Sequence, residues 1–194
     1  MLGLALINEC IKRQIELVAI VREGSPKKVL IPDSSYITTV ECNLSNINSF
    51  SLPRHNSYDT FYHFAWEGTD NSTRNSVDIQ SNNIEYTLNA VSFAHRNNCK
   101  KFIGVGSQAE YGRVDGIISP NMKVSPDSAY GIAKYAAGKL SSILCEQLKM
   151  EFIWTRVFST YGVNDIPSTM IMYCIDSLLK KQKPILTKFS EICY

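Results

Sequence analysis

The stretch KFIGVGSQAEYG, residues 101–112, joins an apolar run to a polar ending that contains serine and glycine. A continuous apolar run of this length is typical of a strand that is covered on both faces, as in a parallel sheet. Ser107 follows this strand at the carboxyl edge of the expected sheet, which is the edge where parallel sheets bind ligands. We therefore expect the Ser107 hydroxyl to orient an oxygen atom of a substrate.

Strand-like and helix-like segments alternate on both sides of this stretch. Such alternation predicts an α/β fold with a doubly wound parallel sheet. Segments 24–35 and 42–58 are rich in Ser, Asn and Pro, and are expected to form loops or short irregular helices. The expected strands span residues 16–21, 36–41, 60–66, 101–106 and 151–158, and the expected helices span 2–14, 75–98, 128–149 and about 166–182.

The composition is that of an ordinary globular protein and argues against several classes of partner. The 194 residues are 44% hydrophobic and 20% charged, with a formal net charge of +2, so no strong electrostatic binding to nucleic acid or to an acidic membrane is expected. The apolar opening MLGLALI runs into Asn8 and Glu9, without the charge pattern of a secretory leader or the length of a membrane span. Six widely spaced cysteines without a CxxC pair predict neither a metal site nor disulfides, and favour a reducing cytoplasm.

The order of elements departs from that of a typical doubly wound nucleotide-binding fold. Such folds open with a strand that leads through a glycine-rich turn into the first helix, whereas here a helix is expected first. On this interpretation Gly3 is the last glycine of that turn, and the first strand lies upstream of Met1. An ordinary glycine at the start of a helix is the alternative.

Tyr130 and Lys134 lie in SPDSAYGIAKYAAGKL, residues 125–140, on an expected helix. At positions i and i+4 the two side chains share one helix face, so the ammonium can favour the ionised form of the phenol. Lowering a phenol pKa from about 10 to near neutrality requires about 4 kcal/mol of differential stabilisation, and gives a usable base. The alternative is a chance pair on an amphipathic helix, with the tyrosine packed and the lysine solvated.

Three groups of residues match the motifs of one family: Ser107, Tyr111-Gly112, and Ser128 through Lys134. They resemble the extended short-chain dehydrogenase/reductase family, in particular its NAD(P)-dependent nucleotide-sugar epimerase/dehydratase group. In that group a strand ending in Ser or Thr and a nearby Tyr-Gly precede S-x-Y-G-x-x-K. The resemblance covers nearly all of residues 1–183. It implies a catalytic group of Ser107, Tyr130 and Lys134, in which Tyr130 moves a proton and Lys134 also holds the nicotinamide ribose.

The resemblance also implies how a dinucleotide cofactor is bound. Ala65, in the segment FYHFAW, would lie against the cofactor, and Phe158, in RVFSTYG, would pass close to the nicotinamide. Asn43 stands where the family usually has an aspartate near the adenine, and Leu44 follows it. Gly3 would be the remaining member of the phosphate-binding turn.

Three further residues are implied in binding a nucleotide sugar: Asn83, Gln108 and Ser159. Asn83 lies in NNIEYTLNA, which is similar to the N-x-x-x-T-x-N segment of the family, and an ordinary asparagine on a helix surface is the alternative. Ser159 replaces the asparagine that commonly helps to hold the sugar nucleotide, so the identity of the sugar stays open.

Cofactor choice depends on the residue that ends the strand at 16–21. An acid there would bind the ribose hydroxyls of NAD, whereas an arginine would accept the phosphate of NADP. The chain has Arg22, followed by Ser25, Lys27 and Lys28, so we expect a phosphate-binding corner and favour NADP over NAD. NAD binding, with these residues forming a solvated basic loop, is the alternative.

The expected reaction follows from a further departure from the family. Its dehydratases carry Thr-Asp-Glu where this chain has Ser107, Gln108 and Ala109, and elimination of water needs those acids. We therefore expect a 4-keto reductase or an epimerase that acts on a nucleotide sugar. Glu110 is one position away from the dehydratase acid, which leaves a dehydratase as a minor alternative.

Two other interpretations stay open: a non-catalytic dinucleotide-binding protein, and an inactive fragment of a longer enzyme. The second arises because the chain looks truncated at both ends. Residues 1–183 would form a Rossmann-like NAD(P)-binding domain that is incomplete at its N-terminus, and residues 184–194 a short tail, with most of the substrate-binding region absent. Neither nucleic acid nor a membrane is expected as a partner, and a homodimer is an option for the full-length protein.

Overall fold

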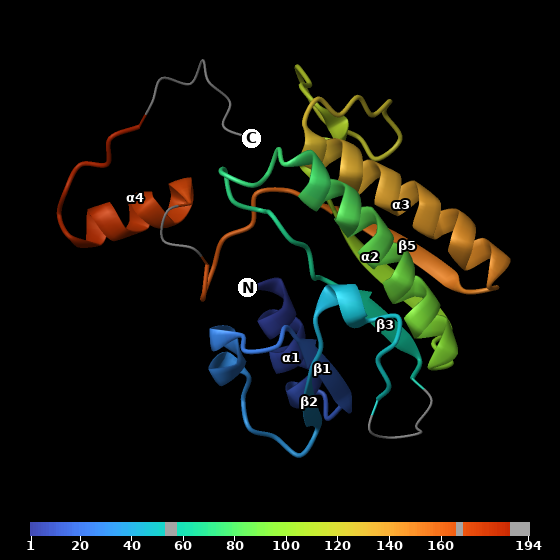
Figure 1. Ribbon diagram of the computed structural model, residues 1–194. Coiled ribbons are helices and arrows are strands. Elements are labelled where there is room, and N and C mark those ends of the chain that lie inside the picture. The colour runs from blue at the N-terminus through green and yellow to red at the C-terminus, as the bar shows by residue number, and fades with distance from the viewer. Residues whose placement is uncertain (53–57, 166–168, 187–194) are drawn as a thin grey trace.

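The computed structural model describes residues 1–52, 58–165 and 169–186, and in them five strands in parallel sheets are combined with four α-helices (Figure 1). Each element lies in a segment predicted from the sequence, so the predicted α/β fold is confirmed. The expected start of the last helix, at residues 166–168, lies outside the described residues. The strands are β1 (Leu17–Val21), β2 (Ile37–Glu41), β3 (Thr60–His63), β4 (Lys101–Ser107) and β5 (Glu151–Val157), and the helices are α1 (Leu2–Lys12), α2 (Val77–Arg96), α3 (Ala129–Gln147) and α4 (Met170–Leu179). Within the described residues only short 3₁₀ helices separate β1, β2 and β3, whereas α-helices separate β3, β4 and β5.

The segments expected to be irregular contain short 3₁₀ helices. These are η1 (Pro26–Leu30) and η2 (Leu44–Asn46), in the two loops that are rich in Ser, Asn and Pro. A third, η3 (Gln108–Tyr111), follows β4 directly and was not predicted. It begins at the carboxyl end of β4, directly after Ser107.

The strands form two parallel sheets. β1 pairs with β2, with Val21 opposite Glu41, and β3, β4 and β5 pair in that order, with Ser107 opposite Val157. Among the described residues, no strand pairs with the second edge of β1 or of β3, so no hydrogen-bonded ladder joins the two sheets. The strand expected upstream of Met1 stays a prediction.

A shared hydrophobic cluster links the two sheets. Phe93 of α2, Cys42 and Ile47 are buried, and Ile20 of β1 and Phe61 of β3 pack against them. Full burial of one such aromatic side chain contributes about 2 kcal/mol. Side-chain packing therefore connects strands that backbone hydrogen bonds leave separate. Helices α2 and α3 lie side by side over one face of the three-stranded sheet (Figure 1).

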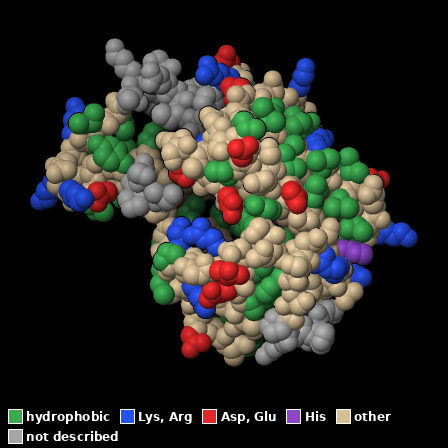
Figure 2. All heavy atoms as spheres, in the orientation of Figure 1, with side chains coloured by type: hydrophobic (Ala, Val, Ile, Leu, Met, Phe, Trp, Pro, Cys, Tyr) green, Lys and Arg blue, Asp and Glu red, His purple; other side chains and the backbone are tan. Residues whose placement is uncertain are grey.

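Hydrophobic side chains are mixed with polar ones on the surface over α2 and α3 (Figure 2). Ile132, Leu140 and Ile143 of α3 are among the exposed apolar residues. Helix α4 lies apart from the sheets in Figure 1, and it exposes Met170 and Leu179. Of the helices that the structure describes, none combines the length and the hydropathy needed to span a membrane.

Trp154 of β5 fills a slot that three glycines leave open. A Cβ atom at Gly138 of α3 would lie 2.7 Å from the indole, and Cβ atoms at Gly104 and Gly106 of β4 would lie closer still. Protein interiors are close-packed and do not accommodate such overlaps. Glycine at these positions therefore allows α3 to approach the sheet, while the indole N–H donates to Glu110 at 2.9 Å.

We predict that Gly138→Ala destabilises the protein, although alanine favours a helix interior over glycine by about 1 kcal/mol. The added methyl group would press on the Trp154 indole, and overpacking of this kind costs about 1–3 kcal/mol. Urea unfolding followed by tryptophan fluorescence measures the change. Lys139→Ala, at the exposed neighbouring position, is the matched control and should barely alter the free energy of unfolding. Equal or higher stability of Gly138→Ala would contradict the packing described for Trp154.

Candidate active site

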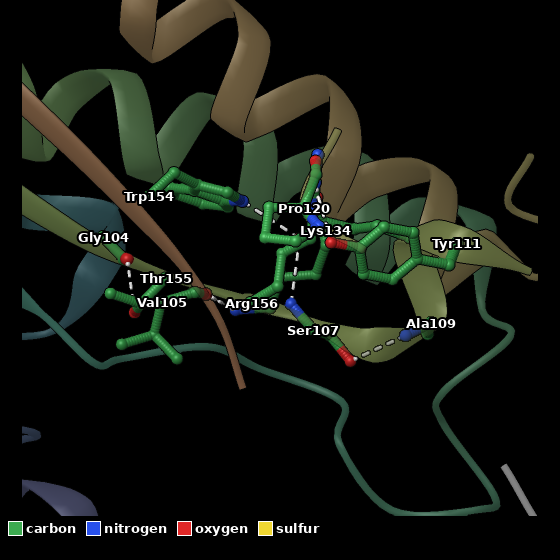
Figure 3. A network of polar contacts seen from close by, with 11 residues as sticks. Gly104, Val105, Ser107, Ala109, Tyr111, Pro120, Lys134, Trp154, Thr155 and Arg156 are labelled. Atoms are coloured by element: carbon green, nitrogen blue, oxygen red, sulfur yellow. Dashed lines mark hydrogen bonds and ion pairs between the residues drawn. The ribbon is translucent and has the colours of Figure 1, made fainter. Parts of the chain in front are cut away.

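Ser107 lies at the junction between β4 and η3, where two hydrogen bonds fix it (Figure 3). Its hydroxyl accepts a hydrogen bond from the Ala109 N–H at 3.2 Å, and its own N–H donates to the Glu110 carboxylate at 2.8 Å. This reciprocal arrangement is a capping box, which satisfies N–H groups that a helix start leaves free. The Ser107 side chain is thereby held at the carboxyl edge of the three-stranded sheet.

The first turn of α3 brings Tyr130 to Ser107. Ser128 caps this helix, with its hydroxyl accepting from the Gly131 N–H at 3.2 Å. A Cβ atom at Gly131 would clash with the carbonyl oxygen of Ala109, so glycine is required for α3 to pack this closely on η3. As a result, the Ser107 hydroxyl interacts with the phenol of Tyr130 and favours its ionised form.

Lys134 is buried one helical turn beyond Tyr130, in surroundings that disfavour its charged form. Its ammonium donates to the Val105 carbonyl at 2.7 Å and lies 3.7 Å from the centre of the Trp66 ring. Burial lowers the pKa of Lys134 to about 7. The side chain therefore gains and loses its proton near neutral pH.

The phenol of Tyr130 is not activated by Lys134 in the way that the i, i+4 spacing predicts. Burial raises the pKa of Tyr130 above its ordinary value, and the groups that oppose this rise are Ser107 and Arg74. Lys134 lies 5.9 Å from the centre of the Tyr130 ring, whereas the Arg74 guanidinium lies 4.2 Å from it. Sequence analysis missed Arg74, because an irregular loop offers no periodicity or spacing that would single it out.

Asn83 is buried and holds the loop that follows β3. Its side-chain oxygen accepts from the Glu67 N–H at 3.0 Å, and its nitrogen donates to the Glu67 carbonyl at 2.9 Å. Gln80 supports the same loop, accepting from the Trp66 indole and donating to the Gly68 carbonyl, both at 2.9 Å. Asn83 is 1% exposed, so the structure gives it a positioning role in this loop, and the substrate contact that the resemblance implies stays a prediction.

Glu110 is fully buried in a network that reaches β5, where Trp154 and Arg156 lie beside Ser107 (Figure 3). Its carboxylate accepts from the Ser107 N–H and from the Trp154 indole, and pairs with Arg156 at 2.8 Å. Arg156 also donates to the Tyr111 hydroxyl at 3.1 Å. The oxygen atoms of Glu110 are thus committed to structural partners, which argues against its serving as the acid of a dehydratase. The sequence analysis singled out neither Trp154 nor Arg156.

Arg22 and Asn43 lie at the corner where β1 and β2 end, with Arg22 exposed. The Asn43 amide donates to the Glu23 carboxylate at 2.8 Å. Lys28, which was expected to help bind a phosphate, pairs with Glu41 at 2.6 Å. The sequence analysis overlooked these two carboxylates, which make the corner less basic than predicted.

The remaining predicted site residues lie at helix starts or just beyond strand ends: Gly3 in α1, Leu44 in η2, Ala65 after β3, Gln108 in η3, and Phe158 and Ser159 after β5. Ala65, Phe158 and Ser159 are exposed. Phe158 also borders a hollow of about 350 Å³ together with Tyr111 and Arg156, and the lining of this hollow includes neither Ser107 nor Tyr130. In the part of the chain that the structure describes, no cluster of side chains could hold a metal ion.

The NAD dependent epimerase/dehydratase family has a sequence model that matches residues 1–190. The chain belongs to this family. The resemblance stated from the motifs is confirmed, and so is the Rossmann-like fold class. A curated member of similar sequence is the uncharacterized UDP-glucose epimerase YtcB of Bacillus subtilis (strain 168), with 26% identity over 166 residues. The match covers 84% of this chain and 51% of YtcB, so the chain spans about half the length of that relative.

Solved epimerases share the fold of this family member. A UDP-N-acetylglucosamine 4-epimerase from Methanobrevibacter ruminantium M1, in complex with UDP-N-acetylmuramic acid, is 18% identical, with a TM-score of 0.81 over 96% of this chain and 62% of that one. The UDP-glucuronic acid 4-epimerase from Bacillus cereus, in complex with NAD, is also 18% identical, with a TM-score of 0.75 over 95% of this chain and 62% of that one. The cofactor in the second structure is NAD, which gives no support to the predicted preference for NADP.

His63, the last residue of β3, is buried behind the site as a neutral side chain. Burial, with a smaller effect from the Lys134 charge, lowers the pKa of His63 to about 3. Its Nε2 atom lies 3.4 Å from the Thr87 hydroxyl, which donates to the Asn83 carbonyl at 2.7 Å. The Thr87 oxygen is thus free to accept a hydrogen bond from the imidazole N–H.

We predict that His63 makes the fold sensitive to acid. The unfolded histidine binds a proton near pH 6.5 and the folded one near pH 3, so the unfolded state binds more protons between these values. The free energy of unfolding therefore falls as the pH drops through this range, by an amount on the order of 5 kcal/mol. His63→Asn should flatten the fall, as measured by urea unfolding at a series of pH values. His95→Asn, at an exposed position on α2, should retain it, and an unchanged slope in His63→Asn would contradict the assignment.

Proposed function

We propose that this chain carries the Ser107–Tyr130–Lys134 site of an NAD(P)-dependent epimerase or 4-keto reductase that acts on a nucleotide sugar. The observation that supports this most is the approach of Ser107 to Tyr130 at the carboxyl edge of the sheet, with Lys134 one helical turn further along α3. Residues 1–183 would form the NAD(P)-binding domain, and the full-length protein is the form in which activity is expected. The complex of a similar epimerase with UDP-N-acetylmuramic acid favours a nucleotide sugar as the substrate class.

In the proposed reaction Tyr130 exchanges a proton with a hydroxyl group of the sugar. The Ser107 hydroxyl donates a hydrogen bond to the same sugar oxygen and holds it in line with the phenol. A nicotinamide cofactor, when bound, supplies or accepts the hydride. Ser107 is buried and Tyr130 is partly buried, which limits the access of water, so that the proton passes between the phenol and the sugar oxygen.

The residues present fit a dinucleotide at several points. An ammonium group has three N–H donors, and Lys134 uses one of them on Val105, so it can also donate to a ribose hydroxyl. Ala65 is exposed just beyond β3 and carries no bulky side chain that would obstruct a flat ring. Arg22 presents its guanidinium at the end of β1, where a phosphate or ribose is expected.

An epimerase or reductase is favoured over a dehydratase by the residues after Ser107. Gln108 and Ala109 carry no acid, and the adjacent Glu110 is buried with its carboxylate paired to Arg156. Elimination of water requires an acid that can reach the leaving hydroxyl group. In this proposal Tyr130, which interacts with Ser107, takes the place of such an acid as the proton-transferring group.

Arg22 is the basis for proposing NADP as the preferred cofactor. Its guanidinium is exposed and can donate two hydrogen bonds to a phosphate in bidentate geometry. Glu23 follows it directly and is positioned by Asn43, which keeps NAD as the competing choice. The balance between this arginine and this carboxylate decides the preference.

We predict that Tyr130→Phe lowers turnover of the full-length protein by about 10²–10⁴-fold. The loss of the hydroxyl removes the proton-transferring group, whereas the ring keeps its packing against Arg74 and Trp66. The Kd for NADPH, measured by fluorescence titration, should therefore change little. Tyr135→Phe, on the same helix, is the control and should retain turnover. Normal turnover in Tyr130→Phe would rule out the proposed mechanism.

We predict that Arg22→Asp shifts the cofactor preference of the full-length protein from NADP toward NAD. The substitution removes the guanidinium that would bind the phosphate and adds a carboxylate that repels it, which together should change the ratio of Kd values by about tenfold or more. Titration of both proteins with NADPH and NADH measures the ratio. Lys123→Asp, at an exposed position outside this corner, introduces the same charge change as a control. An identical ratio in the wild type and Arg22→Asp would remove the basis for the NADP proposal.

A further inference from the structure

The loop between β3 and α2, residues 64–76, is held in a defined shape and tied to α3. In its middle, the Asp70 carboxylate accepts from the Thr73 hydroxyl at 2.7 Å and from the Thr73 N–H at 3.2 Å. Asp and Asn side chains commonly stabilise tight turns in this way. Near its end, the Asn75 side chain accepts from the N–H of Ala129, the first residue of α3, at 3.1 Å. The segment between these two anchors is therefore fixed relative to the start of α3.

Arg74 lies between the two anchors and reaches over Tyr130. Its guanidinium carbon is 4.2 Å from the centre of the Tyr130 ring, and the residue is partly buried. Within the described ranges the structure shows neither an ion pair nor a hydrogen bond for this guanidinium. A cation over an aromatic face is attracted to the ring. Because no carboxylate of the described residues pairs with it, Arg74 also leaves a positive charge beside the phenol.

Arg74 and Lys134 differ in how they can act on Tyr130. Lys134 lies 5.9 Å from the ring centre, and its ammonium is directed at the Val105 carbonyl and the Trp66 ring. An arginine keeps its proton throughout the physiological pH range, whereas a buried lysine can lose its proton. Arg74 is thus the nearer and the more permanent of the two cations.

We propose that Arg74 is a positioning residue of the candidate active site, whose guanidinium holds the Tyr130 ring beside Ser107 and stabilises the phenolate form of Tyr130. The inference rests on the proposed function, in which that phenolate takes a proton from a sugar hydroxyl. It adds a residue of the β3–α2 loop to the proposed catalytic group, whose motif residues lie on β4 and α3. The Asn75 anchor sets the distance at which the guanidinium acts.

Three charged groups from three different elements face Tyr130. Arg74 of the loop and Lys134 of α3 are the cations, and Glu110 of η3 is the anion that opposes ionisation of the phenol. The charge of Glu110 is compensated by its ion pair with Arg156. Loss of Arg74 would leave the more distant and partly neutral Lys134 as the remaining described cation beside a partly buried phenol, so the phenolate should become harder to form.

The proposal can be tested by titrating the phenol itself, in protein labelled with ¹³C at the tyrosine Cζ atoms. Tyr130→Phe identifies the NMR resonance. Arg74→Gln should raise the pKa of Tyr130 by about one unit, and Arg74→Lys, which keeps a charge, by less than half of that. Arg13→Gln removes an exposed arginine directly after α1 and should have no effect. An unchanged Tyr130 pKa in Arg74→Gln would overturn the proposal.

A separate variant tests whether the Asn75 anchor of the loop sets the position of Arg74. Asn75→Ala removes the bond to Ala129 but leaves the guanidinium, so it should raise the Tyr130 pKa by less than Arg74→Gln does. A pKa as low as in the wild type would show that this anchor does not set the distance. The titration needs neither cofactor nor substrate, so its outcome is separate from the turnover test of Tyr130→Phe, and failure of either can be recognised without the other.

A double-mutant cycle covers the case in which the phenol titrates beyond the pH range where the protein stays folded. In urea unfolding, Arg74→Gln should change the unfolding equilibrium constant by about two- to fivefold when Tyr130 is present, which is the usual strength of a partly exposed cation–π contact. The same substitution in a Tyr130→Leu background should have no such effect. Equal effects in both backgrounds would overturn the proposal.

Discussion

The buried carboxylate of Glu110 is the interaction on which the candidate site depends. A buried charge is tolerated only where donors surround it, and here the Ser107 N–H, the Trp154 indole and the Arg156 guanidinium converge on it. These donors belong to β4 and β5, so a single charged group fixes the end of one strand against the next and sets the direction of η3. Such a pair adds little net stability, yet removal of one partner typically costs about 3–5 kcal/mol. Its main contribution is therefore to define where Ser107 lies.

Small residues convert this fixed strand end into a site, because they decide how closely α3 can approach it. The Ala109 carbonyl packs directly against Gly131, and the Trp154 indole packs directly against Gly138. Since α3 carries both Tyr130 and Lys134, the distance between this helix and the sheet helps to determine the distance between the phenol and the Ser107 hydroxyl. In a close-packed interior, one added methyl group at either glycine would be transmitted to that separation. The glycine of the Y-G-x-x-K motif thus has a packing requirement that is independent of catalysis.

The parts that could be predicted from sequence are those that local patterns specify. Strands covered on both faces appear in the sequence as apolar runs, so the strands could be predicted. Ser107, Tyr130 and Lys134 could be predicted as well, because they lie in short motifs of fixed spacing. Arg74 could not, because it meets Tyr130 through a contact between an irregular loop and a distant helix. The hydrogen bonds of Asn83 to the main chain of Glu67 were not predicted either, since a polar residue in a helix looks the same in sequence whether it contacts a ligand or the main chain. The division of the strands into two sheets depends on backbone pairing, which hydrophobic periodicity does not encode.

The candidate site contains one cation that stays charged, Arg74, and one that can lose its proton near neutral pH, Lys134. Burial keeps His63 neutral and brings the pKa of Lys134 to about 7, because a low-dielectric environment disfavours every isolated charge. Arg74 avoids this penalty in part, since it is only partly buried and a guanidinium is weakly hydrated. Tyr130 lies between them, so a phenolate formed there is always accompanied by Arg74 and is accompanied by a second charge only when Lys134 is protonated. Two permanent cations would hold the phenolate more strongly but would also make it a weaker base. In the proposed mechanism, one fixed and one titratable cation would leave the phenol able both to take a proton and to return it.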